Sequence, residues 1–347
     1  MNSPSQAPDS GAAFVQIVGD PLWFADRYDP EHDAFHFRRL TRDDHRAATF
    51  LTDDFLPQGE APLVIRRSDA VAAKPAQAPM HFIFHSAFCC STVLARAFDL
   101  PGAAMGLKEP VLLNDLVGWS HRGGTAREIA PVLDDGLAML ARPFGAGEAV
   151  IIKPSNLANG FAPAVMTMRP RAQALLLHAP LEIYLGSVAR KGMEGRIWVR
   201  DLLVKQLRDG LHNFGYTSED YLGMTDLQTA AIGWLAQHAL FVRMIEAFGP
   251  ARVRTLDSET LMAEPVAAMG ALAAHFGVTM NVEAVVAGPA FTRHSKLGSD
   301  FGASERGDEI RGGADAYADE ITKVTYWATM VAQNAGLSLT LPAGLLV

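Results

Sequence analysis

Short apolar runs alternate with helical patterns along most of the chain. Runs of apolar residues predict a buried strand at 81–85, strands at 63–65, 148–152, 174–177 and 252–256, and a further short strand that ends at Lys108. Apolar residues at helical spacing predict helices at 91–98, 181–190, 226–248, 265–276 and 317–334. Strands separated by helices indicate an α/β domain with a mostly parallel central sheet.

Other stretches are polar and carry no such periodicity. Residues 1–20 are rich in Ser, Pro, Ala and Gly, which predicts a flexible terminus. Residues 26–54 are acidic and polar, with His32, His36 and His45 at spacings that match no metal-ligand pattern, so we expect a solvated surface of helix and loop. The Gly-rich residues 293–315 predict a loop or lid. We therefore expect an N-terminal extension at 21–78 packed on an α/β domain at 79–347.

Composition and charge exclude several classes of protein. Of the 347 residues, 49% are hydrophobic and 20% are charged, a balance that excludes wholesale disorder. The sequence has no apolar run long enough to span a bilayer and no secretory signal at its start, so we expect no membrane partner. The net charge of −8 argues against a nucleic-acid partner. The two cysteines, Cys89 and Cys90, are adjacent and cannot join distant segments, which favours a reducing cytoplasm.

The stretch from Phe82 to Arg96 carries the most chemical information. It predicts an apolar strand, a tight loop of small residues, and then Ser91 and Thr92 opening a helix. This order suits a phosphate or sulfate, because the start of a helix presents unpaired amide groups and the loop backbone can come close to the anion. The Walker pattern would run from His85 to Thr92, but its glycines and its lysine are absent. Simple capping of the helix by Ser91 is the alternative interpretation.

Several segments, in order, resemble motifs of the sulfotransferase family. Residues 89–94 (CCSTVL) resemble the S-G-[ST]-T-x-L part of the loop that holds the 5′-phosphosulfate of PAPS (3′-phosphoadenosine 5′-phosphosulfate). Residues 107–110 and 152–155 resemble strand-end segments near the acceptor, and residues 177–187 resemble the 3′-phosphate motif. Residues 255–265 and 291–296 resemble the two late motifs. The resemblance covers residues 80–310 and implies a three-layer α/β/α fold of the P-loop type with PAPS as co-substrate and no metal.

This resemblance assigns site residues. It implies that Cys89, Cys90, Ser91 and Thr92 cradle the phosphosulfate, and that His178, Ser187, Arg190 and Lys296 contact the rest of the nucleotide. The sequence departs from the family at three places: Phe88 replaces the cation of the loop, His178 replaces an arginine, and Ser187 lies one residue late. Sulfuryl transfer also needs a cation at the bridging oxygen and a base for the acceptor. Lys153, at a strand end, is the candidate cation. Glu109 is the first candidate base and His85 the second, although a surface or structural role is the alternative for each.

We therefore predict a sulfotransferase, a cytoplasmic enzyme that moves a sulfuryl group from PAPS to a hydroxyl or amine of a small-molecule acceptor. A P-loop kinase that uses ATP or GTP is one alternative, and a non-catalytic nucleotide-binding relative is another. The sequence leaves the acceptor open, and it leaves the oligomeric state open, with a homodimer among the options.

Overall fold

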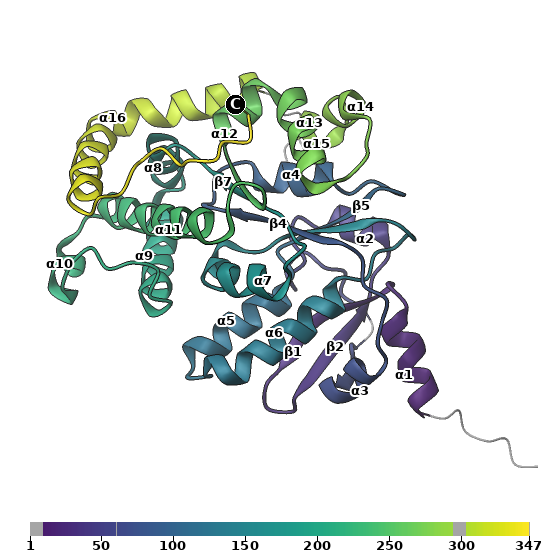
Figure 1. Cartoon of the computed structure of the whole chain (residues 1–347). Coiled ribbons are helices and arrows are strands. Elements are labelled where there is room, and N and C mark those ends of the chain that lie inside the picture. The colour runs from purple at the N-terminus through teal and green to yellow at the C-terminus, as the bar shows by residue number, and fades with distance from the viewer. Residues whose placement is uncertain (1–9, 60, 294–302, 347) are drawn as a thin grey trace, which may run out of the picture. The chain divides into compact units, whose positions relative to one another are not determined.

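The computed structural model describes residues 10–59, 61–293 and 303–346 (Figure 1). The chain forms two compact units. The first unit consists of Met1–His81 and Phe98–Ile152, and the second of Phe82–Ala97 and Lys153–Val347.

A five-stranded sheet confirms the predicted α/β class. Its strand order is β5 (Ala104–Lys108), β6 (Ala149–Lys153), β4 (Met80–His85), β7 (Ala174–His178) and β8 (Val253–Asp257). Strand β7 pairs in parallel with β4, where His85 lies opposite Leu177, and with β8, where His178 lies opposite Asp257. Every residue of β4 is buried, as the continuous apolar run predicts for a strand covered on both faces. The carboxyl ends of these parallel strands, where ligands bind in such folds, therefore meet at one edge.

The helices predicted at 91–98, 181–190, 226–248 and 265–276 are present in the second unit, whereas the helix Gly192–Arg208 was not predicted. Helix α11 forms the long amphipathic helix that the sequence predicts, and Thr225 caps it through a reciprocal bond with Gln228. The helical elements of this unit are α4 (Ser91–Ala97), a 3₁₀ helix η1 (Asn156–Phe161), α7 (Ala162–Met168), α8 (Leu181–Arg190), α9 (Gly192–Arg208), α10 (Ser218–Gly223), α11 (Asp226–Phe248), α12 (Ser258–Ala263), α13 (Pro265–Phe276), α14 (Val282–Val286), α15 (Pro289–Thr292) and α16 (Ala303–Asn334).

The prediction of a loop at 293–315 is wrong over the second half of this range. Helix α16 already begins at Ala303, fourteen residues before the expected start at Tyr317, while residues 294–302 lie outside the described part. Gly312 and Gly313 disfavour a helix locally, but an established helix extends at little cost because each added residue gains one backbone hydrogen bond.

The first unit has two strands in the region at 26–54 where the sequence predicts solvated helix and loop, and it also has the strand predicted at 63–65. An antiparallel sheet joins β1 (Trp23–Asp29), β2 (Ala34–Arg39) and β3 (Leu63–Arg66). Asp26 in β1 is fully buried, and the guanidinium of Arg38 in β2 donates to its carboxylate over 2.9 Å. The charged residues that suggested a solvated surface are therefore partners across a sheet. The helices of this unit are α1 (Ser10–Gly19), α2 (Arg42–Ala47), α3 (Arg67–Ala72), α5 (Val111–His121) and α6 (Ala126–Leu140).

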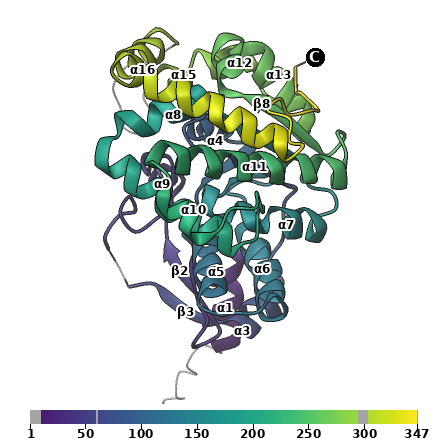
Figure 2. The same cartoon turned by 90° about the vertical axis from the view of Figure 1, so that its left-hand side faces the viewer.

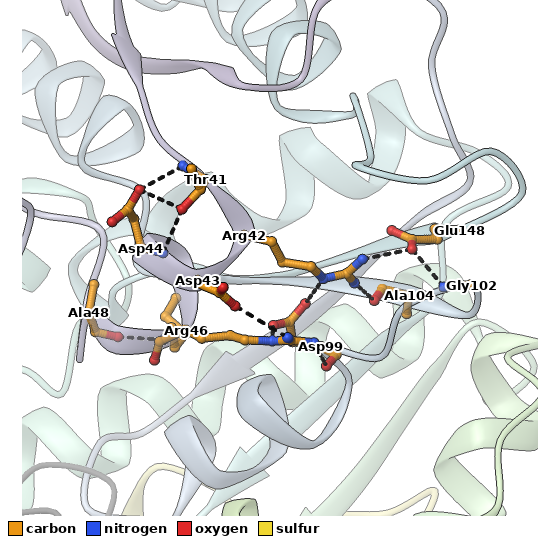
Figure 3. Close-up of polar contacts among 11 residues, drawn as sticks. Thr41, Arg42, Asp43, Asp44, Arg46, Ala48, Asp99, Gly102, Ala104 and Glu148 are labelled. Carbon is orange, nitrogen blue, oxygen red and sulfur yellow. Dashed lines mark hydrogen bonds and ion pairs between the residues drawn. The ribbon is translucent and has the colours of Figure 1, made fainter.

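Arg42 holds a cluster of polar groups together in the first unit (Figure 3). Its guanidinium donates to Asp99 over 2.9 Å, to Glu148 over 2.8 Å and to the carbonyl of Ala104 over 2.7 Å. The carboxylate of Glu148, only 2% exposed, also accepts the N–H of Gly102. The cluster thereby fixes α2 against the segments that flank β5 and β6.

Candidate active site

The loop between β4 and α4 has an unusual backbone. Ala87, Phe88 and Cys90 adopt positive φ angles of 72°, 52° and 60°, although none is glycine. Such left-handed residues cost of order 1–3 kcal/mol each and persist only where the surroundings impose them. Turns of this kind can gather successive amide N–H groups into a concavity that binds anions.

Two side chains at the end of β4 impose this backbone. The Ser86 hydroxyl accepts the N–H of Ala179 over 3.1 Å and donates to the carbonyl of Ala87 over 3.2 Å. The N–H of Ala87 donates to Nδ1 of His85 over 3.1 Å, which assigns the proton of this imidazole to Nε2. Nε2 in turn lies 3.0 Å from the carbonyl of Pro154 and donates to it. His85, the second candidate base, is thus buried with both ring nitrogens engaged by the protein.

A second layer of amides supports the same strand end. Nδ2 of Asn159 in η1 donates to the carbonyl of His85 over 2.9 Å and to Oε1 of Gln237 in α11 over 3.0 Å. Gln237 is fully buried and Asn159 is 1% exposed. No sequence motif marked these two residues, because an amide that supports a carbonyl has no characteristic spacing.

The aromatic ring of Phe88 packs against two helices of the second unit. Its ring lies 5.6 Å from that of Tyr184 in α8 and 5.4 Å from that of Trp198 in α9. These aromatic contacts stabilise the left-handed conformation of the loop and place an apolar group within it.

The polar candidates of the loop lie in one neighbourhood of the second unit. Ser91 and Thr92 are the first residues of α4, and each is only 6% exposed. Cys89 is buried and Cys90 is partly exposed. Lys153 ends β6, is 1% exposed, and directly precedes Pro154, whose carbonyl accepts from His85. The candidate cation is therefore next to the residue that anchors the loop.

The nucleotide candidates on β7 and α8 separate into two groups. The guanidinium of Arg190 donates to the hydroxyl of Ser187 over 3.2 Å, so these two residues are together on α8. His178 lines a cavity at the ends of β7 and β8, and burial lowers the pKa of its imidazole, so the ring is neutral at pH 7. Lys296 lies outside the described residues.

Sequence reasoning missed an arginine pair near α4. Burial lowers the pKa of Arg96 in α4, and the positive charge of Arg293, directly after α15, lowers it further. Two cationic groups in one neighbourhood create a positive potential there. Arg293 lies within the late motif, so the resemblance pointed to this segment, whereas Arg96 gave no signal.

Glu109, the first candidate base, belongs to the first unit. It follows β5 and has a positive φ of 54°. Its neighbour Lys108 is 3% exposed and donates to the carbonyls of Arg46 and Ala48 at the end of α2. Lys108 therefore has a structural role within this unit.

Within the residues that the structure describes, no helix is long and apolar enough to cross a bilayer. Nor does the described part of the chain contain a group of three or more His, Cys, Asp or Glu side chains able to hold a metal ion.

Comparison with known proteins finds likenesses of fold at low identity. No protein-family model matches the sequence, and no curated protein matches it. Among solved structures, the chain is similar to a sulfotransferase domain from the curacin biosynthetic pathway, with 12% identity, a TM-score of 0.43, and coverage of 76% of this chain and 99% of that one. It is also similar to the sulfotransferase STF9 from Mycobacterium avium (12% identity, TM-score 0.41, coverage of 91% and 92%). A third similar structure is the sulfotransferase STF1 from Mycobacterium tuberculosis H37Rv (15% identity, TM-score 0.37, coverage of 70% and 77%).

Proposed function

We propose that the protein is a transferase that moves a sulfuryl group from PAPS to a hydroxyl or amine of a small-molecule acceptor. The observation that carries the proposal is the loop at 86–90, where Ala87, Phe88 and Cys90 hold left-handed conformations directly before Ser91 and Thr92. Strain of this kind is maintained where close approach of the backbone to a ligand requires it. The ordered sequence motifs support a phosphosulfate as that ligand.

The chemistry requires few groups. The acceptor oxygen or nitrogen attacks sulfur, the bond from sulfur to the bridging oxygen of the 5′-phosphate breaks, and adenosine 3′,5′-bisphosphate leaves with the electron pair. In our proposal the loop amides with Ser91 and Thr92 hold the phosphosulfate, and the Lys153 ammonium stabilises charge on the bridging oxygen. Glu109 remains the proposed base for the acceptor proton, and Ser187 with Arg190 the proposed 3′-phosphate contacts. His85 supports the loop backbone in this scheme, because its ring nitrogens are already engaged.

Calorimetric titration with adenosine 3′,5′-bisphosphate tests the donor. We expect the wild type to bind, and the double variant Ser91→Ala, Thr92→Val to bind at least about tenfold more weakly, because two charge-assisted hydrogen bonds are lost. Ser68→Ala, at an exposed serine of α3, is the matched control and leaves the affinity unchanged. Absence of binding by the wild type would contradict the proposal, and binding of Mg-ATP in its place would favour the kinase alternative.

Release of the bisphosphate from PAPS, measured against a panel of phenols and amines, tests the transfer step. Lys153→Met is expected to lower the turnover rate more than the affinity for the bisphosphate, because the ammonium acts on charge that develops during bond breaking. Tight bisphosphate binding without turnover on any acceptor would instead favour the alternative that the protein is a non-catalytic relative. That alternative has a specific basis, because Phe88 stands where the resemblance implies a cation in the loop.

A further inference from the structure

A cavity with a mixed polar and apolar lining lies at the carboxyl ends of β7 and β8. Its volume is about 520 Å³, and the walls come from these strand ends, the start of α8, Trp234 of α11, Thr325 of α16 and the tail after α16. Figure 2 shows α16 lying along α8 and α11, which closes this side of the second unit. A cavity of this volume is large enough for a drug-sized molecule.

The C-terminal tail is a fixed wall of the cavity. The N–H of Thr255 in β8 donates to the carbonyl of Ala343 over 3.0 Å, and the N–H of Leu345 donates to the carbonyl of Thr255 over 2.8 Å. The Thr255 hydroxyl also donates to the carbonyl of Pro342. These bonds hold Leu341 and Leu345 against the space between the strand ends.

The charge of the lining selects against anions. Among the described residues, the lining contains the carboxyl groups of Asp257 and Glu182 and no lysine or arginine. Burial raises the pKa of Asp257, but hydrogen bonds from Thr260 and Glu259 and the neighbouring His178 outweigh burial and keep the pKa below its usual value, so the group is ionised at neutral pH. His178 adds no positive charge, because burial favours the neutral imidazole. A phosphate in this cavity would face two negative charges without a cation.

The hydrogen-bond capacity of Asp257 is not exhausted. Its Oδ1 accepts the N–H groups of Glu259 and Thr260, and its Oδ2 accepts the hydroxyl of Thr260. A carboxylate offers about four lone-pair sites, so Oδ2 can accept one more donor. Two buried polar atoms in the lining, Nδ1 of His178 and Oγ1 of Thr325, have no partner within the described part of the chain.

We infer that this cavity binds a small organic cation, an ammonium group on an apolar or aromatic body, with the Asp257 carboxylate as its counter-ion. The indole of Trp234 and the leucines of the tail accommodate the body, and an indole ring also attracts a cation. The site is separate from the anion-binding loop, so the inference stands independently of the proposed donor.

The cavity is nonetheless connected to the loop. The N–H of Ala179 donates to Ser86, while the carbonyl of Ala179 accepts Nε1–H of Trp234 over 2.8 Å. The residues on either side of Ala179, His178 and Pro180, both line the cavity. One peptide segment therefore touches the loop on one side and the cation site on the other.

Three probes with the same body and different head groups test the inference. Tryptamine is a cation, tryptophol is neutral and indole-3-acetate is an anion at pH 7. We expect tryptamine to raise the melting temperature of the full chain and to bind at least about tenfold more tightly than tryptophol in calorimetry, with no binding of indole-3-acetate. Equal affinity for all three probes, preference for the anion, or no binding of tryptamine at millimolar concentration overturns the inference.

Asp257→Asn isolates the charge. Asparagine caps a helix about as well as aspartate, so α12 keeps its cap while the counter-ion is lost. We expect this variant to lose about tenfold in tryptamine affinity and to retain its affinity for tryptophol. Asp319→Asn removes an exposed carboxylate of α16 and serves as the control for net charge. Unchanged tryptamine binding by Asp257→Asn overturns the inference. Should that variant fail to fold, Leu341→Trp is the second variant, because the larger side chain fills the cavity. It must abolish tryptamine binding. The affinity for adenosine 3′,5′-bisphosphate is measured in parallel on the same variant.

Discussion

The hydroxyl of Ser86 accepts the backbone N–H of Ala179 over 3.1 Å and so ties the start of the loop between β4 and α4 to the end of β7. Ser86 is fully buried, and the same hydroxyl donates to the carbonyl of Ala87. One small side chain thus connects two parallel strands at the edge where ligands are expected.

Ser86→Ala is expected to destabilise the fold and weaken anion binding together. Removal of the hydroxyl leaves the N–H of Ala179 buried without an acceptor, which costs about 1–3 kcal/mol. Urea unfolding measures the free energy of unfolding, and calorimetry measures the affinity for adenosine 3′,5′-bisphosphate. The exposed Ser68→Ala control changes neither. A variant with unaltered stability would show that the bond contributes nothing.

Ala87→Gly is expected to stabilise the protein, which is unusual for an alanine-to-glycine change. At a φ of 72° the alanine carries a left-handed strain of about 1–2 kcal/mol that glycine lacks, and this exceeds the entropy that glycine adds to the unfolded chain. The same change at Ala274, exposed in α13, is expected to cost about 1 kcal/mol. Opposite signs in urea unfolding check the prediction, and two losses of equal size would refute it.

Arg42→Met is expected to cost about 3 kcal/mol, because the carboxylate of Glu148 would remain buried without its cation and with only backbone N–H groups near it. The matched control is Arg46→Met. Arg46 is 41% exposed and pairs with Asp99, which keeps its bond to Arg42, so its loss is expected to cost about 0–1 kcal/mol. Chemical denaturation of the two variants side by side makes the comparison. Equal losses would mean that burial of Glu148 is unimportant.

Burial of His45 is expected to make the free energy of unfolding decrease in acid. Burial between Phe24 and Phe144 lowers the pKa of its imidazole from 6.5 to about 3. Between these two values the unfolded chain binds a proton that the folded chain does not, so the stabilisation is complete above pH 6.5 and is lost as the pH falls.

His45→Phe removes this linkage. The slope of unfolding free energy against pH below 6.5 is expected to decrease by up to about 1.4 kcal/mol per pH unit. His32→Gln is the control: the hydrogen bond to Asp29 raises the pKa of this exposed histidine, so its removal does not flatten the slope. An unchanged slope in His45→Phe would contradict the prediction.

Local pattern was sufficient for the elements whose stability is mainly local or wholly apolar. The continuous apolar run of β4 and the periodicity of α11 both predicted the observed element, and small polar residues after β4 indicated the loop. The hydrophobic pattern did not predict β1. The sequence alone does not show whether Asp26 is buried or solvated, because its burial depends on the ion pair with Arg38, which only the folded chain forms.

The sequence by itself determined the α/β class, the position of the loop and most of its polar candidates. Only the tertiary structure decided the backbone conformation of the loop. The loop has no glycine that would indicate the left-handed conformations of Ala87, Phe88 and Cys90. The hydrogen bonds that impose these conformations involve Ala179 and Pro154, which are far away in the sequence. It also decided that Asp257 faces a cavity closed by the tail. The physical reason is the same in both cases: periodicity reports burial along one element, whereas strain and charge pairing depend on groups far apart in the chain.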